Sequence, residues 1–217
     1  MSRTLFFLVF LLFCGCRPEP IPTPASPSPL LSSASAVTFT DVTQSAGIRF
    51  RHQNGATGKK LLPETMSGGG GFIDIDADGW LDIVLVNSAA GQTSLSTKGA
   101  SPFLTLYHNN RKGAFREESQ RIEWKGECYG MGVVVADYDN DGFDDLYVTG
   151  IPQGKLFHNL PDGKGGRKLV EVTGRSGLVD KGWSASGAWL DYDRDGKLDL
   201  FITHYVQWSP QKDQGSF

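Results

Sequence analysis

Aspartate residues recur in this sequence at a spacing that could bind metal ions. Each of three short segments places Asp at its first, third, fifth and ninth positions and Gly at its sixth position. The segments begin at Asp74, Asp137 and Asp191, so their starts lie 63 and 54 residues apart. The twelve candidate metal ligands are Asp74, Asp76, Asp78, Asp82, Asp137, Asp139, Asp141, Asp145, Asp191, Asp193, Asp195 and Asp199.

The chemistry of these acidic loops favours Ca²⁺. Calcium takes about six to eight oxygen ligands, whereas Mg²⁺ binds few carboxylates and keeps its waters. Zinc prefers His and Cys, and the loops contain neither. Four carboxylates within nine residues repel one another unless a cation lies between them, and Gly permits the sharp turn that wraps the chain around an ion. We therefore expect about three calcium sites.

The loops have two other possible interpretations. The EF-hand shares positions 1, 3, 5 and 6, but it needs a bidentate Glu at position 12 and a helix on each side. Position 12 is Leu85, Val148 and Ile202, and the segments that follow the loops are rich in the β-branched and aromatic residues of strands. A solvated acidic turn is the second alternative. Three copies at one place in a repeat argue against it.

The loops belong to a longer repeat. LDIVLVN, DDLYVTG and LDLFITH follow the three acidic segments, LYHN at 106–109 matches LFHN at 156–159, and FREES at 115–119 matches LVEVT at 169–173. Four short strands in each unit of 54 to 63 residues are the pattern of a propeller blade. We expect an all-β fold over residues 37–217, with about two and a half β-propeller blades of four antiparallel strands each.

The amino terminus is typical of an exported protein. A short positive start and an apolar stretch at 5–13 predict a signal peptide over residues 1–16, and the stretch is shorter than the roughly 20 residues of a membrane span. Gly15-Cys16 resembles a bacterial lipobox, which implies lipidation of Cys16, although an ordinary signal peptide cut nearby is the alternative. Residues 17–36 contain six Pro and five Ser and predict an extended tether.

The segment at 37–43 and two histidines lead to further expectations. FTDVT at 39–43 matches the last strand of the later units, so residues 37–43 are predicted to form an outermost strand whose own blade is missing. His108 and His158 occupy the same repeat position, which favours a structural role over a ligand role. Cys128 is the only cysteine after residue 16, so no disulfide can form inside the folded part. Bound metal could supply stability instead.

The glycine-rich lead and the DxDxDGxxD loop together resemble the FG-GAP/VCBS repeats of integrin α-subunit propellers and bacterial surface proteins. FTDVT at 39–43 and HYVQWSP at 204–210 are more narrowly similar to the family of the cartilage acidic protein and bacterial proteins with an ASPIC/UnbV module. This resemblance implies a seven-bladed propeller with calcium in most blades. The chain holds two complete units and half of a third, so we interpret it as a fragment.

Two classes of function follow. The first is an extracytoplasmic binding or adhesion module on a bacterial lipoprotein, with an unknown protein or glycan ligand and a lipid anchor in the membrane. Because Arg17 rather than Asp follows the lipobox, that resemblance implies the outer membrane. The second is a propeller-based hydrolase or lyase that is active only in the full-length product. Motifs such as G-x-S-x-G are absent, so we expect no enzyme, and the net charge of −3 argues against nucleic acid.

Overall fold

The computed structural model describes residues 37–56, 59–66, 68–88, 103–126, 128–209 and 211–213. The chain divides into two units, of which the second begins at Asp41 and holds the sheets described below. The predicted signal peptide, the predicted lipidation site Cys16 and the predicted tether all lie outside the described residues. Within the described ranges, no helix has the length and apolar character that crossing a membrane requires.

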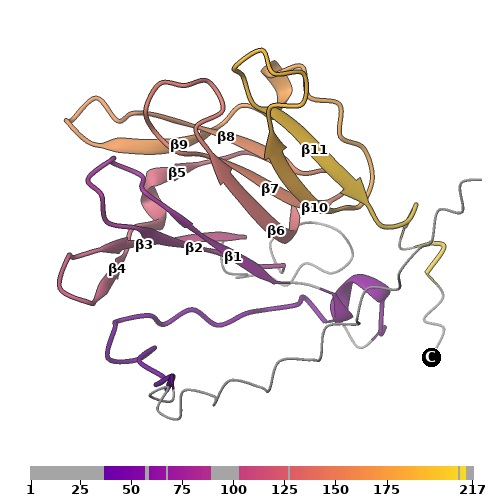
Figure 1. Cartoon of the computed structure of the whole chain (residues 1–217). Coiled ribbons are helices and arrows are strands. Elements are labelled where there is room, and N and C mark those ends of the chain that lie inside the picture. Colours follow the sequence, from indigo (N-terminus) through magenta and orange to yellow (C-terminus); the bar gives the residue numbers. More distant parts are fainter. Residues whose placement is uncertain are drawn as a thin grey trace, which may run out of the picture. The chain divides into compact units, whose positions relative to one another are not determined.

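The described part of the second unit forms three β-sheets in sequence order (Figure 1). The first sheet has the order β1-β2-β3-β4 and is antiparallel throughout. The second has the order β5-β9-β8-β7-β6, and the third pairs β10 with β11. The strands are β1 (Gly69–Ile73), β2 (Asp82–Val86), β3 (Leu104–Asn109), β4 (Phe115–Glu117), β5 (Ile122–Glu123), β6 (Tyr129–Ala136), β7 (Asp145–Ile151), β8 (Lys155–Pro161), β9 (Arg167–Glu171), β10 (Ser184–Leu190) and β11 (Asp199–His204).

The prediction of an all-β fold built from partial propeller blades is confirmed. Each complete blade is a four-stranded antiparallel sheet, and the third sheet contains the first two strands of another. The second sheet carries one addition, because β5 pairs in parallel with β9. The described residues also form three short 3-10 helices: η1 (Leu62–Thr65) precedes β1, η2 (Ser119–Arg121) lies between β4 and β5, and η3 (Thr173–Arg175) lies between β9 and β10.

The core lies between neighbouring sheets. All seven residues of β7 are buried. Leu146 and Val148 pack with the first sheet in a cluster that includes Val84, whereas Tyr147 packs on the opposite face with Trp189 from the third sheet. This alternation follows from the two-residue period of a strand. The second sheet is therefore covered on both faces by its neighbours.

Glycine allows the first strands of adjacent blades to approach closely. A Cβ atom added at Gly69 of β1 would lie 2.9 Å from the Cα of Gly132 in β6 and 3.0 Å from the carbonyl oxygen of Met131. No side chain fits in that space without a backbone shift. Glycine at this position thus serves the contact between the first two blades.

The prediction of a strand at residues 37–43 is wrong. Residues 37–42 have no regular structure, and residues 43–47 form a turn. The chain joins the first sheet only after this point, where the Phe115 amide donates a hydrogen bond to the Ala46 carbonyl over 2.7 Å. Within the described residues, no strand includes any residue from 37 to 43, so the segment adds no strand to the first sheet.

Candidate metal centres

The three acidic loops occupy the same place in each sheet. They connect β1 to β2, β6 to β7, and β10 to β11 (Figure 1). In the first loop, the carboxylate of Asp74 accepts hydrogen bonds from the backbone amides of Asp78, over 3.0 Å, and Gly79, over 2.8 Å. Asp137 and Asp191 make the same two bonds within their own loops. The first aspartate therefore folds each loop back onto itself.

The backbone of each loop turns through two residues with positive φ. The fourth position adopts φ of 55° at Ala77, 59° at Asn140 and 63° at Arg194. The sixth position adopts φ of 84° at Gly79, 89° at Gly142 and 86° at Gly196. The φ of the fourth position lies in the left-handed helical region, which side chains can adopt, whereas the larger φ of the sixth position lies beyond that region and explains the three glycines.

The ninth aspartate ties the end of the loop to its start and to the third strand of the blade. Asp145 accepts hydrogen bonds from the amides of Tyr138, over 3.3 Å, and Asn159, over 2.7 Å. Asp82 makes the equivalent bonds to Ile75 and Asn109 in the first sheet. The third sheet repeats the bond to the second position, where Asp199 accepts from the Tyr192 amide over 2.9 Å.

Burial destabilises the charged form of two of these ninth-position carboxylates. The side chains of Asp82 and Asp145 have no solvent-exposed area. Burial raises the pKa of Asp82 above its usual range and raises the pKa of Asp145 to about 6, while hydrogen bonds from backbone amides act in the opposite direction. A divalent cation beside these carboxylates would favour their ionised form.

Most of the predicted ligands converge. The predicted ligands form four groups, and within each group one candidate ligand atom from every residue lies within 4.8 Å of the others. Three groups contain carboxylates alone, and the fourth also contains a histidine. The groups are Asp74, Asp76 and Asp78; Asp137, Asp139 and Asp141; Asp191, Asp193 and Asp199; and Asp139, Asp145 and His158. Within the described ranges, the predicted ligands Asp82 and Asp195 belong to none of these groups.

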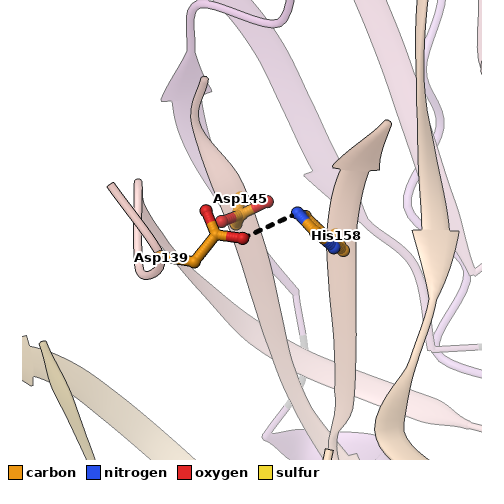
Figure 2. A group of neighbouring side chains, drawn as sticks. All are labelled: Asp139, Asp145 and His158. Carbon is orange, nitrogen blue, oxygen red and sulfur yellow. Dashed lines mark ion pairs between the residues drawn. The ribbon is translucent and has the colours of Figure 1, made fainter. Parts of the chain in front are cut away.

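Two histidines lie against the loops, which sequence reasoning did not predict. Figure 2 shows His158 on β8 pointing toward Asp139 and Asp145, with its Nε2 3.0 Å from Asp139 Oδ2. In the first blade, His108 Nδ1 lies 3.0 Å from Asp82 Oδ1. Both histidines precede the asparagine that bonds to the ninth aspartate, so the shared LYHN and LFHN sequences could have indicated this arrangement.

Two arginines also face the acidic loops. The guanidinium group of Arg111 binds the Asp78 carboxylate, with Nε donating over 2.8 Å. Arg167 Nη2 lies 3.4 Å from Asp141 Oδ2, and its guanidinium group lies 3.4 Å above the centre of the Phe143 ring. These cations approach the fifth position of the first loop from the β3–β4 turn and that of the second loop from β9, and they offset part of the negative charge there.

The residues present fit a hard divalent cation. The donor atoms are carboxylate oxygens, which Ca²⁺ prefers. Asp76 Oδ1 is buried and makes no hydrogen bond within the described residues, so it has capacity to bind an ion. A nucleophilic role for Cys128 is disfavoured, because burial raises the pKa of its thiol to about 12 and keeps it protonated.

Comparison with known proteins found a matching family model and a similar protein. Residues 74–148 match the family model described as an FG-GAP-like repeat. These residues run from the first acidic loop to the middle of β7. Cartilage acidic protein 1 from Homo sapiens is 25% identical over 173 residues, which cover 77% of this chain and 23% of that protein. The chain therefore spans about a quarter of the length of this relative.

Proposed function

We propose that this chain, which carries an FG-GAP-like repeat and folds as partial β-propeller blades, is a calcium-stabilised extracellular binding module. The observation that carries the proposal is the recurrence of one loop geometry in three sheets. Each loop has the same aspartate-to-amide hydrogen bonds and the same two residues with positive φ. Such a repeated arrangement of carboxylates favours a shared ligand.

Calcium would act on stability in this proposal. The first, third, fifth and ninth aspartates of each loop would hold the ion, which would offset the repulsion among their carboxylates. The loops join the first two strands of each sheet, so an ion bound there would hold those strands together. A ligand that binds only the folded state stabilises it by about 2.7 kcal/mol per site at 100 times its dissociation constant.

Calorimetry with Ca²⁺ tests the metal sites. We expect about three ions per chain, with dissociation constants of roughly 10⁻⁴ to 10⁻³ M, the range of extracellular modules. The matched control is a triple variant at the third position, Asp76→Asn, Asp139→Asn and Asp193→Asn, which should lose the binding heat. Excess EDTA should lower the melting temperature of the wild type and leave that of the triple variant unchanged. A folded wild-type sample without binding heat would exclude the calcium sites.

A binding role is proposed in preference to catalysis. The acidic clusters that the described residues form are explained by the loops, and the buried thiol of Cys128 is unsuited to nucleophilic attack. The ligand class we propose is an extracellular protein or glycan. Protein and glycan arrays, probed with the full-length gene product with and without calcium, would identify it. Binding that EDTA leaves intact would separate ligand recognition from the calcium loops.

We also propose that the protein is anchored in the bacterial outer membrane through lipid on Cys16. The support is the sequence Gly15-Cys16 at the end of an apolar stretch, followed by a tether rich in Pro and Ser. The variant Cys16→Ser should move to the soluble fraction of the cell, whereas the control Cys14→Ser should stay with the membrane. Membrane retention of Cys16→Ser would rule out this anchor.

A further inference from the structure

The first acidic loop is bonded directly to the second one. Asp144 occupies the eighth position of the second loop, next to the buried Asp145. Its Oδ2 accepts a hydrogen bond from the backbone amide of Asp74 over 2.9 Å. Asp74 is the first position of the first loop. The Asp144 side chain of the second loop is therefore bonded to the backbone of Asp74, a predicted ligand of the first metal site.

Asn159 on β8 supplies a second link between the same loops. Its side-chain Nδ2 donates to the Ile75 carbonyl of the first loop over 2.8 Å and to the Asp144 carbonyl over 3.0 Å. Its backbone amide donates to Asp145 Oδ1 over 2.7 Å. Asn159 is fully buried. The hydrogen bonds of this residue thus fix the spacing between the two loops away from solvent.

The other blades of the chain provide a natural comparison. The eighth position is Leu81 in the first loop and Leu198 in the third, and neither side chain can accept a hydrogen bond. Asn109 matches Asn159 in the repeat, and its Nδ2 donates to the Leu81 carbonyl of its own loop over 2.9 Å. The second and third loops are joined by an exposed bond, from Asn140 Nδ2 to the Gly196 carbonyl over 3.2 Å.

We propose that the first two metal sites are energetically coupled, with Asp144 and Asn159 as the positioning residues that transmit the coupling. An ion in the second loop would hold Asp145 and with it the adjacent Asp144. A fixed Asp144 would hold the Asp74 amide in place, so that less order has to be gained when an ion enters the first loop. Coupling between sites is reciprocal, so filling the first site must strengthen the second by the same factor. This inference rests on the proposed calcium binding.

Trp80 makes the first site observable on its own. It occupies the seventh position of the first loop, where the other loops carry Phe143 and Lys197. Tb³⁺ takes the same hard oxygen ligands as Ca²⁺, and tryptophan nearby sensitises its luminescence. The part of the Tb³⁺ signal that disappears in Trp80→Phe reports the first site, and Ca²⁺ competition against that signal gives its affinity.

The decisive variant is Asp144→Leu, which introduces the residue present at this position in the other two loops. We expect it to weaken binding at the first site about fivefold or more, although every ligand of that site is unchanged. Asp144→Asn removes the charge but keeps an acceptor oxygen, so it should leave the first site closer to the wild type. Equal affinity of wild type and Asp144→Leu at the first site would overturn the coupling.

A second measurement approaches the coupling from the opposite site. Asp76→Asn with Asp78→Asn disables the first loop, and calorimetry then gives the affinity of the remaining sites. The affinity of the second site should fall by the same factor by which Asp144→Leu lowers the affinity of the first site. If the second and third sites keep their wild-type affinities, the coupling is also overturned. If the wild type binds neither Ca²⁺ nor Tb³⁺, the proposed calcium function fails and the coupling fails with it. Hydrogen exchange of the Asp74 amide, measured in EDTA, tests the bond between the two loops separately from calcium binding. Asp144→Leu should speed this exchange even when no metal is bound.

Discussion

At the scale of single residues, each acidic loop depends on a glycine that few other residues could replace. Gly142 has φ of 89°, and a Cβ added there would meet no atom within 4 Å. Space is therefore available, and the backbone conformation alone restricts the residue type. Gly174, in η3, also has open space around it but lacks a positive φ. Because neither position is crowded, a comparison of alanine substitutions at the two glycines isolates the effect of the positive φ.

Gly142→Ala should destabilise the fold by about 1–2 kcal/mol, because left-handed backbone disfavours a side chain by that amount. Gly174→Ala should be neutral or stabilising by up to about 1 kcal/mol, because alanine restricts the unfolded chain. Urea unfolding in excess Ca²⁺, followed by tryptophan fluorescence, measures both changes. Equal effects of the two substitutions would contradict a role for the positive φ.

The sequence predicts the aspartates and glycines of the loops because their spacing repeats. It does not predict the partners of those aspartates. Arg111 and Arg167 reach the loops from distant turns and strands, and Asp144 bonds across a blade boundary to Asp74. Such contacts depend on how the sheets pack, and no local spacing encodes them.

At the scale of secondary-structure elements, Asp180 connects the second sheet to the third. Its carboxylate accepts hydrogen bonds from the Tyr147 hydroxyl over 2.7 Å and the Gly154 amide over 2.5 Å, and it lies 2.6 Å from His204 Nε2. These partners come from β7, the β7–β8 connection and β11. Burial opposes ionisation of Asp180, but the hydrogen bonds outweigh it and hold its pKa below the usual range.

This lowered pKa gives Asp180 a defined dependence on pH. A carboxyl group with a lower pKa in the folded state adds stability above its unfolded pKa of about 3.9, and this stability is lost as the pH falls through the folded pKa. Asp180→Asn should therefore be less stable than the wild type near pH 5 by about 1–3 kcal/mol, and the difference should shrink toward pH 3. Urea unfolding of both proteins in EDTA over this range measures the difference. A gap that stays constant with pH would contradict the assignment.

The sequence predicts the strands that recur in each repeat unit and does not predict a strand that occurs once. The four-strand order of the blades follows from alternating apolar residues and from turn residues that recur in each unit. β5 has two residues and pairs in parallel with β9, so its sequence is too short for a strand pattern. The segment at 37–43 matches the last strands of the blades in sequence, but the structure assigns no strand to these residues.

At the scale of the whole folded unit, burial is highest in the middle sheet and lowest on the outer faces. β7 is buried along its whole length, whereas Phe72 on β1 is 64% exposed and Phe201 on β11 is 60% exposed. Phe72 lies on the face of the first sheet opposite the core, because its neighbour Ile73 packs toward the second sheet. The described residues therefore leave an apolar side chain on each outer face.

We expect these faces to drive self-association of the 217-residue chain, since each presents a large exposed apolar side chain that contact with a second molecule would bury. The double variant Phe72→Thr with Phe201→Thr should shift the chain toward the 23.6 kDa monomer in size-exclusion chromatography with light scattering in Ca²⁺. Val179→Thr is the control, because Val179 is 80% exposed but lies in a connection outside the sheets. A monomeric wild type would contradict the prediction.

The number of blades in the described part was predictable, and the size of a full ring was not. Counting repeats in the sequence yields two complete blades and half of another, as the sheets confirm. The seven-bladed propeller rests on the family resemblance and stays a prediction, because each sheet contacts only its neighbours and no sequence pattern within one blade records the total.

The close contact between Gly69 and Gly132 has a geometric consequence for any ring that these repeats build. Blades in a ring are sectors of a circle, and the angle between two sectors depends on how near their inner edges come. Here the inner edges meet where a single methyl group would not fit. A methyl at either position would push the inner edges apart and make the two sheets more nearly parallel. Each sector would then subtend a smaller angle, and more of them would be needed to complete a turn, so the absence of a side chain at Gly69 and Gly132 bears on the angle between the first two blades.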